Sequence, residues 1–435
     1  MTGPRLPQGT RLLIAGDAVS AIGTGLVLPL TLIYLHQVRD IALPAVGLLL
    51  TASGVVGLIA TPLTGVALDR FGARRVLASM LAGQALAEAG LAWAHSVPTA
   101  VAPVLALGAS FGPSFPAFQT MLARVNPDPD VQQRAFAVSF TALNAGIGAG
   151  GAIGAAVADV QHPASFQALF LANALSCVIF AMPVCALPDA RAATVAGEPK
   201  ASYRQVVADR GLRTVLLAML VLAFTGYAAL DSGLPAYATV EAGVSARVVA
   251  LSITLNTAVI VGSQLLVLRL VRRLRRSRAP ATIGLIWALA WAVFGLSALP
   301  AASGQRVAGV LAFTALFGVG ETFLAPTASP LVNSLAGDRV RGHANALAGM
   351  ALSVAFVASP AICTGMIAAG LAGAWIGLLC AGCLGAVLLG QRLGRQVQPH
   401  QDRLEADETP AAEPALRWAR WPTAGAAPVP PTGRR

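Results

Sequence analysis

The sequence GVALDRFGARR, residues 65–75, gathers charge in a chain that has little of it elsewhere. One acid and three arginines fall within this stretch, although charged residues make up only 11% of the 435 residues. The sequence on either side is apolar, from 45 to 68 and from 76 to 95. Residues 65–75 therefore form a short polar connection between two segments that must be removed from water.

Apolar segments of this kind recur along the whole chain, which is 56% hydrophobic with a mean hydropathy of +0.70. Soluble domains average roughly 45–50% apolar residues, and about 17–25 apolar residues cross the hydrocarbon core of a bilayer. We therefore expect an all-α integral membrane protein with twelve transmembrane helices. The twelve predicted spans are 12–35, 45–68, 76–95, 99–122, 135–158, 165–187, 212–236, 248–270, 280–300, 307–330, 343–368 and 371–391.

The basic residues support this count. An even number of spans places both termini on one side, and the basic residues of alternate loops should gather on the cytoplasmic side. Of the 30 basic residues, only Arg39, Arg247 and Arg306 fall on the other side. We therefore expect both termini to be cytoplasmic. The net charge of +11 reflects membrane topology and not a nucleic-acid partner.

The longest polar interruption separates six spans from six. The two sides share a pattern, because Gly108 and Pro116 recur as Gly318 and Pro326 at a constant offset of 210. The end of the chain is rich in Pro, Ala and charge and cannot bury a core. We therefore expect two related six-helix bundles. The predicted division is an N-terminal bundle at 1–187, a central cytoplasmic linker at 188–211, a C-terminal bundle at 212–394 and a disordered cytoplasmic tail at 395–435.

The motifs of enzymes and nucleotide-driven pumps are missing from the sequence. It has no G-x-x-x-x-G-K-[ST] phosphate loop. Residues 146–151, GIGAGG, match the dinucleotide pattern G-x-G-x-x-G, but they lie inside a predicted span with no preceding strand. We interpret them as a site of close helix packing, because small residues let membrane helices approach each other. We expect a protein that is not an enzyme and has no cofactor and no metal site.

One glutamate is the strongest candidate for a proton carrier. Glu321 lies near the predicted midplane of its span, and we expect Gly318, Gly320 and Pro326 to loosen the helix around it. An ionised carboxylate at that depth costs at least about 2.5–3.5 kcal/mol, so it should be protonated, paired or next to water. The alternative is a permanently protonated side chain that bonds to a neighbouring helix.

Three further acids fall inside predicted spans. Asp17 lies near the start of its span and is either an interfacial residue or a functional one. Asp231 lies in the outer half of its span and either serves the mouth of a cavity or has a structural role. We interpret Glu88 as a polar packing residue. Asp17 and Asp231 join Glu321 as candidates for proton coupling.

The charged stretch resembles the signature loop of the major facilitator superfamily, G-x-x-x-D-R-x-G-x-R-R, and stands between the second and third spans as that loop does. The resemblance covers about residues 10–394. It implies two bundles that rock about a midplane cavity lined by spans one, four, seven and ten, where three of the four acids lie. The residues that match the motif are Gly65, Asp69, Arg70, Gly72, Arg74 and Arg75.

The resemblance implies that this loop is a cytoplasmic gate. The acid of the motif would meet the positive N-terminal end of a helix in the other half, and the arginines would meet acids or helix C-termini. Asp128 and Asp130 are the candidate partners of Arg70 or Arg74. Gly72 permits the tight turn between the spans.

We predict a proton-coupled transporter of the inner membrane, a monomer that exports small, moderately hydrophobic molecules. Proton-coupled drug exporters are the branch considered, although span four lacks their basic residue and span five lacks their proline. One alternative is a uniporter or a proton symporter that imports sugars or other metabolites. A second is a transporter-like sensor or scaffold that signals through its tail. Polar candidates for contact with substrate are Gln119, Asn144, Asn256 and Asn333.

Overall fold

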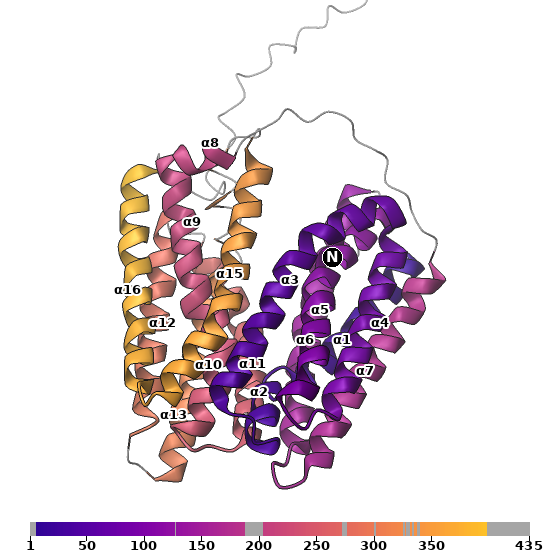
Figure 1. The fold of residues 1–435 in the computed structure, drawn as a ribbon. Coiled ribbons are helices and arrows are strands. Elements are labelled where there is room, and N and C mark those ends of the chain that lie inside the picture. Colours follow the sequence, from indigo (N-terminus) through magenta and orange to yellow (C-terminus); the bar gives the residue numbers. More distant parts are fainter. Residues whose placement is uncertain are drawn as a thin grey trace, which may run out of the picture.

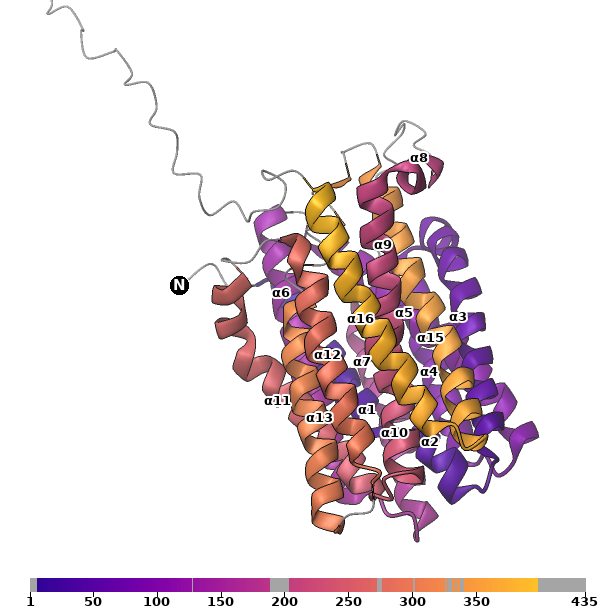
Figure 2. The ribbon, with the colours of Figure 1, turned by 90° about the vertical axis from the view of Figure 1, so that its left-hand side faces the viewer.

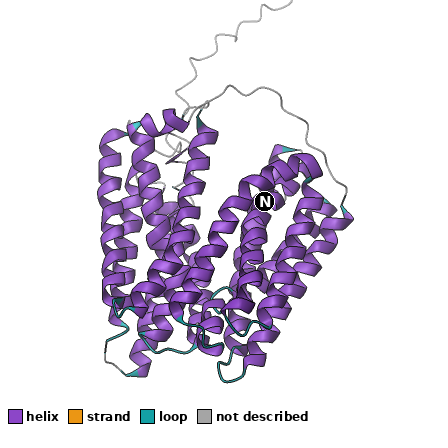
Figure 3. Cartoon of the chain, viewed as in Figure 1, coloured by secondary structure: helices purple, strands orange, loops and turns teal. Residues whose placement is uncertain are grey.

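The described part of the chain is helical and contains no strand (Figure 3). The computed structural model describes residues 6–126, 128–187, 203–271, 276–299, 302–324, 327, 331–332, 335–336 and 340–397. Asn333, Pro326 and the predicted tail from residue 398 onward lie outside these ranges.

The N-terminal half contains six membrane-length helical segments, of which the first is interrupted. Its elements are α1 (Gln8–Val27), α2 (Thr31–Ile33), the π-helical turn η1 (Tyr34–Val38), α3 (Leu43–Phe71), α4 (Ala73–Ala92), α5 (Val97–Val125), α6 (Pro129–Val157) and α7 (Pro163–Ala186).

The C-terminal half has the same plan. A short helix, α8 (Tyr203–Ala208), precedes it, and its first membrane segment is again interrupted. The elements that follow α8 are α9 (Arg210–Ala223), the π-helical turn η2 (Phe224–Ala228), α10 (Ala229–Val240), α11 (Ala246–Val271), η3 (Arg276–Arg278), α12 (Ala279–Leu296), α13 (Ser303–Leu324), α15 (Arg341–Ala368) and α16 (Ala372–Gln396).

The helices confirm the twelve predicted spans. Eleven helical segments of the described chain are long and apolar enough to cross a membrane. The twelfth is α4, whose hydropathy is lowered by Gln84 and Glu88 and which packs against α5 and α7. Gly370 has a φ of 71° and lies in the turn from α15 to α16, where the sequence predicts one. The first span begins earlier than predicted, at Gln8 instead of residue 12.

The seventh span is broken at Gly226, whose backbone angles of φ −104° and ψ −105° are not helical. A side chain at this position would collide with the Trp287 ring, which fills the break. The break also frees backbone carbonyls, which need new donors in a membrane. The indole N–H of Trp291 donates to the carbonyl of Thr225 at 2.7 Å, so the break is stabilised from α12.

The two halves contact each other mainly through two helix pairs, α3 with α15 and α6 with α11. These pairs lie on opposite edges of the molecule (Figure 2). We call the end that holds the start of α1, α8 and the end of α16 the basic end, and the opposite end the far end. The halves approach each other near α2 and α10, at the far end, and diverge toward α8 (Figure 1).

Side-chain contacts show the same asymmetry. Near the far end, a Cβ atom on Gly47 would overlap Thr364 of α15, and the hydroxyl of Thr254 donates to the Gly148 carbonyl at 3.1 Å. Nearer the basic end, a Cβ atom on Gly65 of α3 or on Gly262 of α11 would have no neighbour within 4 Å. The structure therefore shows one state, with the halves in contact at the far end and apart at the basic end.

The glycine-rich stretch of α6 packs closely against two other helices, as its sequence predicts. Cβ atoms on Gly146 and Gly150 would overlap the backbone of α1, within the same half. Cβ atoms on Gly148 and Gly151 would approach Thr257 and Thr254 of α11, in the other half. A dinucleotide-binding turn is excluded at this place, because the whole stretch is helical.

The repeated glycine has the same structural role in both halves. A Cβ atom on Gly108 of α5 would overlap Ser53 of α3, and one on Gly318 of α13 would approach Asn256 of α11. In each half the fourth span thus packs on the second at this glycine. The match supports two related halves.

Candidate functional site

Glu321 lies where three helices of the C-terminal half meet. Its half-buried side chain projects from α13. The amide of Asn256, from α11, donates to Glu321 Oε2 at 3.3 Å. The hydroxyl of Tyr227, from the break between α9 and α10, is a second hydrogen-bond partner. Asn256 is the eleventh of the 26 residues of α11, which agrees with the predicted depth near the midplane.

The surroundings of Glu321 are rigid and aromatic. Trp287 stacks on Phe317 with ring centroids 4.6 Å apart, and its N–H donates to the Phe317 carbonyl at 3.0 Å. Cβ atoms on Gly318 and Gly320 would press against Asn256 and Trp287. The prediction that these glycines loosen the helix is therefore wrong. They bring neighbouring helices close to Glu321, and α13 continues unbroken to Leu324.

Asp231 lies four residues after Tyr227, and therefore on the same face of the helix. Its side chain is exposed, in contrast to the buried residues that follow it in α10. Tyr227 was missed by the sequence analysis. The spacing of a tyrosine and an acid at i and i+4 was the available signal.

Asp17 lies in the middle of α1. Because α1 begins at Gln8, Asp17 is about 14 Å along a helix that rises 1.5 Å per residue. Its half-buried carboxylate accepts a hydrogen bond from the Ser139 hydroxyl of α6 at 3.1 Å. Whether Asp17 is an interfacial residue or a functional one stays a prediction.

Glu88 lies inside the N-terminal half. Its side chain is 4% exposed, and the Asn173 side chain of α7 is its hydrogen-bond partner. Its Oε2 atom is buried with no hydrogen-bond partner among the described residues. One turn earlier, the Gln84 amide donates to the Ser110 carbonyl of α5 at 3.3 Å. Glu88 thus contributes to packing among the helices of its own half.

Of the three polar candidates that the structure describes, one contacts an acid. Asn256 contacts Glu321. Asn144 donates to the Phe140 carbonyl of its own helix at 2.8 Å, which leaves its amide oxygen available. Gln119 is half-buried on α5, and the fourth candidate, Asn333, lies outside the described residues.

The charged loop connects α3 to α4 at Gly72, whose φ of 85° lies in the left-handed region that glycine tolerates. The Arg70 guanidinium lies 5.2 Å from the centroid of the Phe71 ring. Arg74 donates to the Leu187 carbonyl at 3.4 Å, at the end of the half, and Arg75 is exposed. The side chain of Asp69 lies outside what the structure describes.

The candidate partners of this loop lie at the start of α6. Asp128 Oδ1 accepts a hydrogen bond from the Val131 N–H at 3.1 Å, which satisfies one of the free donors of the helix start. The side chain of Asp130 is not described. A pairing of either acid with Arg70 or Arg74 stays a prediction.

Two six-helix bundles in contact at one end, with acids on helices of both bundles, are the arrangement of a membrane transporter. The sequence profile of the Major Facilitator Superfamily matches residues 13–360. The chain belongs to this superfamily, and its members are transporters and not enzymes.

Known proteins resemble the chain over most of its length. The Bacillus subtilis (strain 168) protein YttB, described as an uncharacterized MFS-type transporter, is 25% identical over 342 residues, which are 76% of this chain and 81% of YttB. The crystal structure of a D-xylose-proton symporter is 14% identical with a TM-score of 0.68, covering 91% of this chain and 99% of the symporter.

A second solved structure is the nucleoside transporter NupG, which is 11% identical with a TM-score of 0.68 and covers 90% of this chain and 99% of NupG. At these identities the two solved structures share the fold alone. They confirm the fold class.

Proposed function

We propose that the chain is a proton-coupled secondary transporter of the plasma membrane that exports small, moderately hydrophobic molecules. The basic end faces the cytoplasm in this proposal, because nearly all basic residues belong to that side. The structure then corresponds to an inward-facing state. Outward-facing states arise when the halves rock, closing the basic end and opening the far end.

The observation that carries the proposal is the setting of Glu321. Its two described partners, Asn256 and Tyr227, are both neutral. When this carboxyl group gains or loses a proton, no described counter-charge compensates the change. A proton and a substrate that binds the carboxylate therefore compete for one group. Such competition couples the movement of one to the movement of the other.

The setting of the acid supports the substrate class. Trp287 and Phe317 are fully buried and stack behind the acid, whereas the Tyr227 ring beside it is half-buried. Small-molecule sites combine apolar surfaces with a few polar groups that fix orientation. A molecule of moderate hydrophobicity, neutral or cationic, suits this setting better than an anion, because Glu321 would repel a negative charge.

The test is proton movement in proteoliposomes that hold an internal pH dye, with a panel of dyes, drugs and sugars as substrates. Wild type is compared with Glu321→Gln, and Glu88→Gln is the matched control because it makes the same change inside one half. Substrate-driven proton movement that is lost only in Glu321→Gln supports the proposal. The sign of that movement distinguishes an exporter from a symporter that imports its substrate.

Two outcomes contradict the proposal. Substrate flux without proton movement, equal in all three proteins, would make the chain a uniporter. No flux of any compound, together with a loss of cellular function when residues 395–435 are removed, would favour the sensor or scaffold.

A further inference from the structure

Three arginines depart from the gathering of basic residues on the predicted cytoplasmic side, and the structure shows their hydrogen-bond partners. Arg39, Arg247 and Arg306 are the basic residues predicted on the non-cytoplasmic side. Each donates to a backbone carbonyl at or just beyond the end of another helix. The last carbonyls of a helix lack partners within the helix and carry its negative dipole end, so a guanidinium satisfies both needs.

Two of these arginines act within one half. Arg39 donates to the carbonyl of Ala92, the last residue of α4, at 3.3 Å, and its guanidinium lies over the Tyr34 ring. Arg306 donates to the carbonyl of Ala242, just beyond α10, at 3.2 Å. Both contacts join helices of a single half, so neither needs to break when the halves move as rigid bodies.

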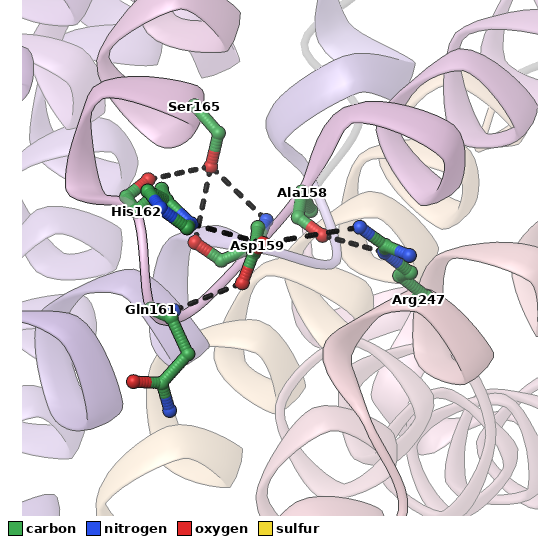
Figure 4. A network of polar contacts seen from close by, with 6 residues as sticks. All are labelled: Ala158, Asp159, Gln161, His162, Ser165 and Arg247. Atoms are coloured by element: carbon green, nitrogen blue, oxygen red, sulfur yellow. Dashed lines mark hydrogen bonds and ion pairs between the residues drawn. The ribbon is translucent and has the colours of Figure 1, made fainter.

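Arg247 is different because it joins the two halves. It is the second residue of α11, in the C-terminal half. Its Nε donates at 3.1 Å to the carbonyl of Ala158, directly after α6 of the N-terminal half. Its Nη2 also lies 4.0 Å from Asp159 Oδ2, as Figure 4 shows.

The acceptor loop is ordered by its own contacts. Asp159 Oδ1 accepts a hydrogen bond from the Gln161 N–H at 3.0 Å, and Oδ2 lies 3.1 Å from His162 Nδ1. The Ser165 hydroxyl donates to the carbonyl of His162 at 2.8 Å and accepts from the Asp159 N–H at 3.0 Å (Figure 4). The loop thus holds the carboxylate and the carbonyl in place for the arginine, which lowers the ordering cost of the contact.

We propose that Arg247 is the far-end latch of the transport cycle, a positioning residue that stabilises the inward-facing state by tying α11 to the end of α6. The proposal rests on the alternating-access function proposed above. Opening of the far end must break the contacts of Arg247, whereas Arg39 and Arg306 keep theirs. The latch therefore sets how often the far end opens and does not contact the substrate.

The test measures the distance between the halves in the full chain, reconstituted in lipid nanodiscs. Spin labels are placed at His95→Cys and Gly304→Cys, two exposed far-end positions in different halves. The background carries Cys185→Ser and Cys380→Ser, because the other three cysteines are buried. Pulsed electron spin resonance then gives the ratio of open to closed far ends.

Arg247→Ala is expected to raise the ratio of open to closed far ends about three- to tenfold. This is the effect expected when one charge-assisted, partly exposed contact is lost. Asp159→Asn, which keeps the Ala158 carbonyl, is expected to give a smaller rise. Arg39→Ala and Arg306→Ala are the matched controls and should leave the ratio unchanged. An unchanged ratio in Arg247→Ala, or an equal rise in the controls, overturns the latch.

The distance measurement does not depend on flux. If Arg247→Ala shifts the distances of a protein that moves no protons, the latch stands and proton coupling fails. If protons move with substrate but the distances stay the same, the latch alone fails.

Discussion

The two halves of the molecule each bury a glutamate, and they place it differently. Glu88 lies on α4, which packs against α5 and α7 of its own half, and its side chain is 4% exposed. Glu321 is half-buried, and its partners lie on α11, which packs against α6 of the other half, and in η2, at the break of the seventh span. Both residues are glutamates, so the residue type does not distinguish them. The position of their hydrogen-bond partners identifies Glu88 as a packing residue and Glu321 as the candidate for proton coupling.

The difference extends to the cores around the two acids. Behind Glu321, the rings of Trp287, Phe317, Trp291 and Phe313 pack in an aromatic cluster. Beside Glu88 the named polar partner is Asn173 of α7. The C-terminal half therefore holds its acid against an aromatic cluster, whereas the N-terminal half buries its acid beside one polar side chain.

The largest expected effect comes from making the same substitution in both halves. Glu321→Gln should abolish substrate-driven proton movement, because the amide cannot exchange a proton. Glu88→Gln should leave the rate within about twofold, since a polar packing residue keeps its hydrogen bond. The measurement is dye-reported proton flux at equal amounts of reconstituted protein. Equal losses in both variants would remove the distinction between the halves.

Asn256→Ala sharpens the comparison by removing a partner of Glu321 while the acid remains. Hydrogen bonds to charged groups contribute about 1.5–3 kcal/mol, so the substrate-driven flux should fall about tenfold or more. Asn173→Ala is the corresponding change at Glu88 and should lower thermal stability with little effect on flux. A normal flux in Asn256→Ala would show that Glu321 acts without this partner.

The gate loop gives the N-terminal half a role of its own. Asp69→Asn is expected to weaken the outward-facing state and to slow transport about threefold, because one charge at a helix end contributes about 0.3–1 kcal/mol. Expression should be normal. Arg75→Gln, at the exposed arginine of the same loop, is the control. Transport at the wild-type rate in Asp69→Asn would contradict the gate role.

Stability measurements address Glu88 directly. Glu88→Leu leaves the Asn173 amide without its partner in a buried place, at an expected cost of about 1–3 kcal/mol. Glu88→Gln keeps a polar partner and should cost less. The check is the unfolding midpoint of each variant in detergent. A leucine variant more stable than wild type would show that the hydrogen bond is not needed for packing.

The smallest effect concerns pH at the far end. The Gln161 N–H and then His162 hold the pKa of Asp159 below its ordinary value. A lowered pKa contributes stability above the unfolded value of roughly 3.9 and loses it only as the pH falls through the folded value. The difference in far-end distances between wild type and Asp159→Asn should therefore stay constant from pH 8 to pH 5. A difference that changes within this range would show that a group other than Asp159 controls the contact.

Apolar length and charge were enough to predict the twelve spans, because a bilayer imposes both requirements locally. The close packing of the glycine stretch in α6 followed for the same reason. The start of α1 at Gln8 was missed because the helix begins in a polar stretch that hydropathy does not count as part of a span. The break at Gly226 depends on Trp287, which is distant in sequence, so the seventh span looked like any other apolar run.

The candidate site was predicted less completely than the fold. An acid within an apolar span indicated Glu321 as a candidate. The sequence of that span does not indicate Tyr227, which lies in another span, as its partner. The three arginines of the far end looked like exceptions to a charge rule. Their function depends on where other helices end in space, which neither charge nor periodicity encodes.

Trp287 gives the protein an optical reporter of its own. Its ring stacks on Phe317, four residues before Glu321, lies against Tyr227 and fills the break at Gly226. Indole emission responds to changes in the surroundings of the ring. Ligand binding at Glu321, or a rotation of α10 about the break at Gly226, would therefore alter the fluorescence of the unlabelled protein. The Trp287→Phe variant would show how much of that change comes from Trp287.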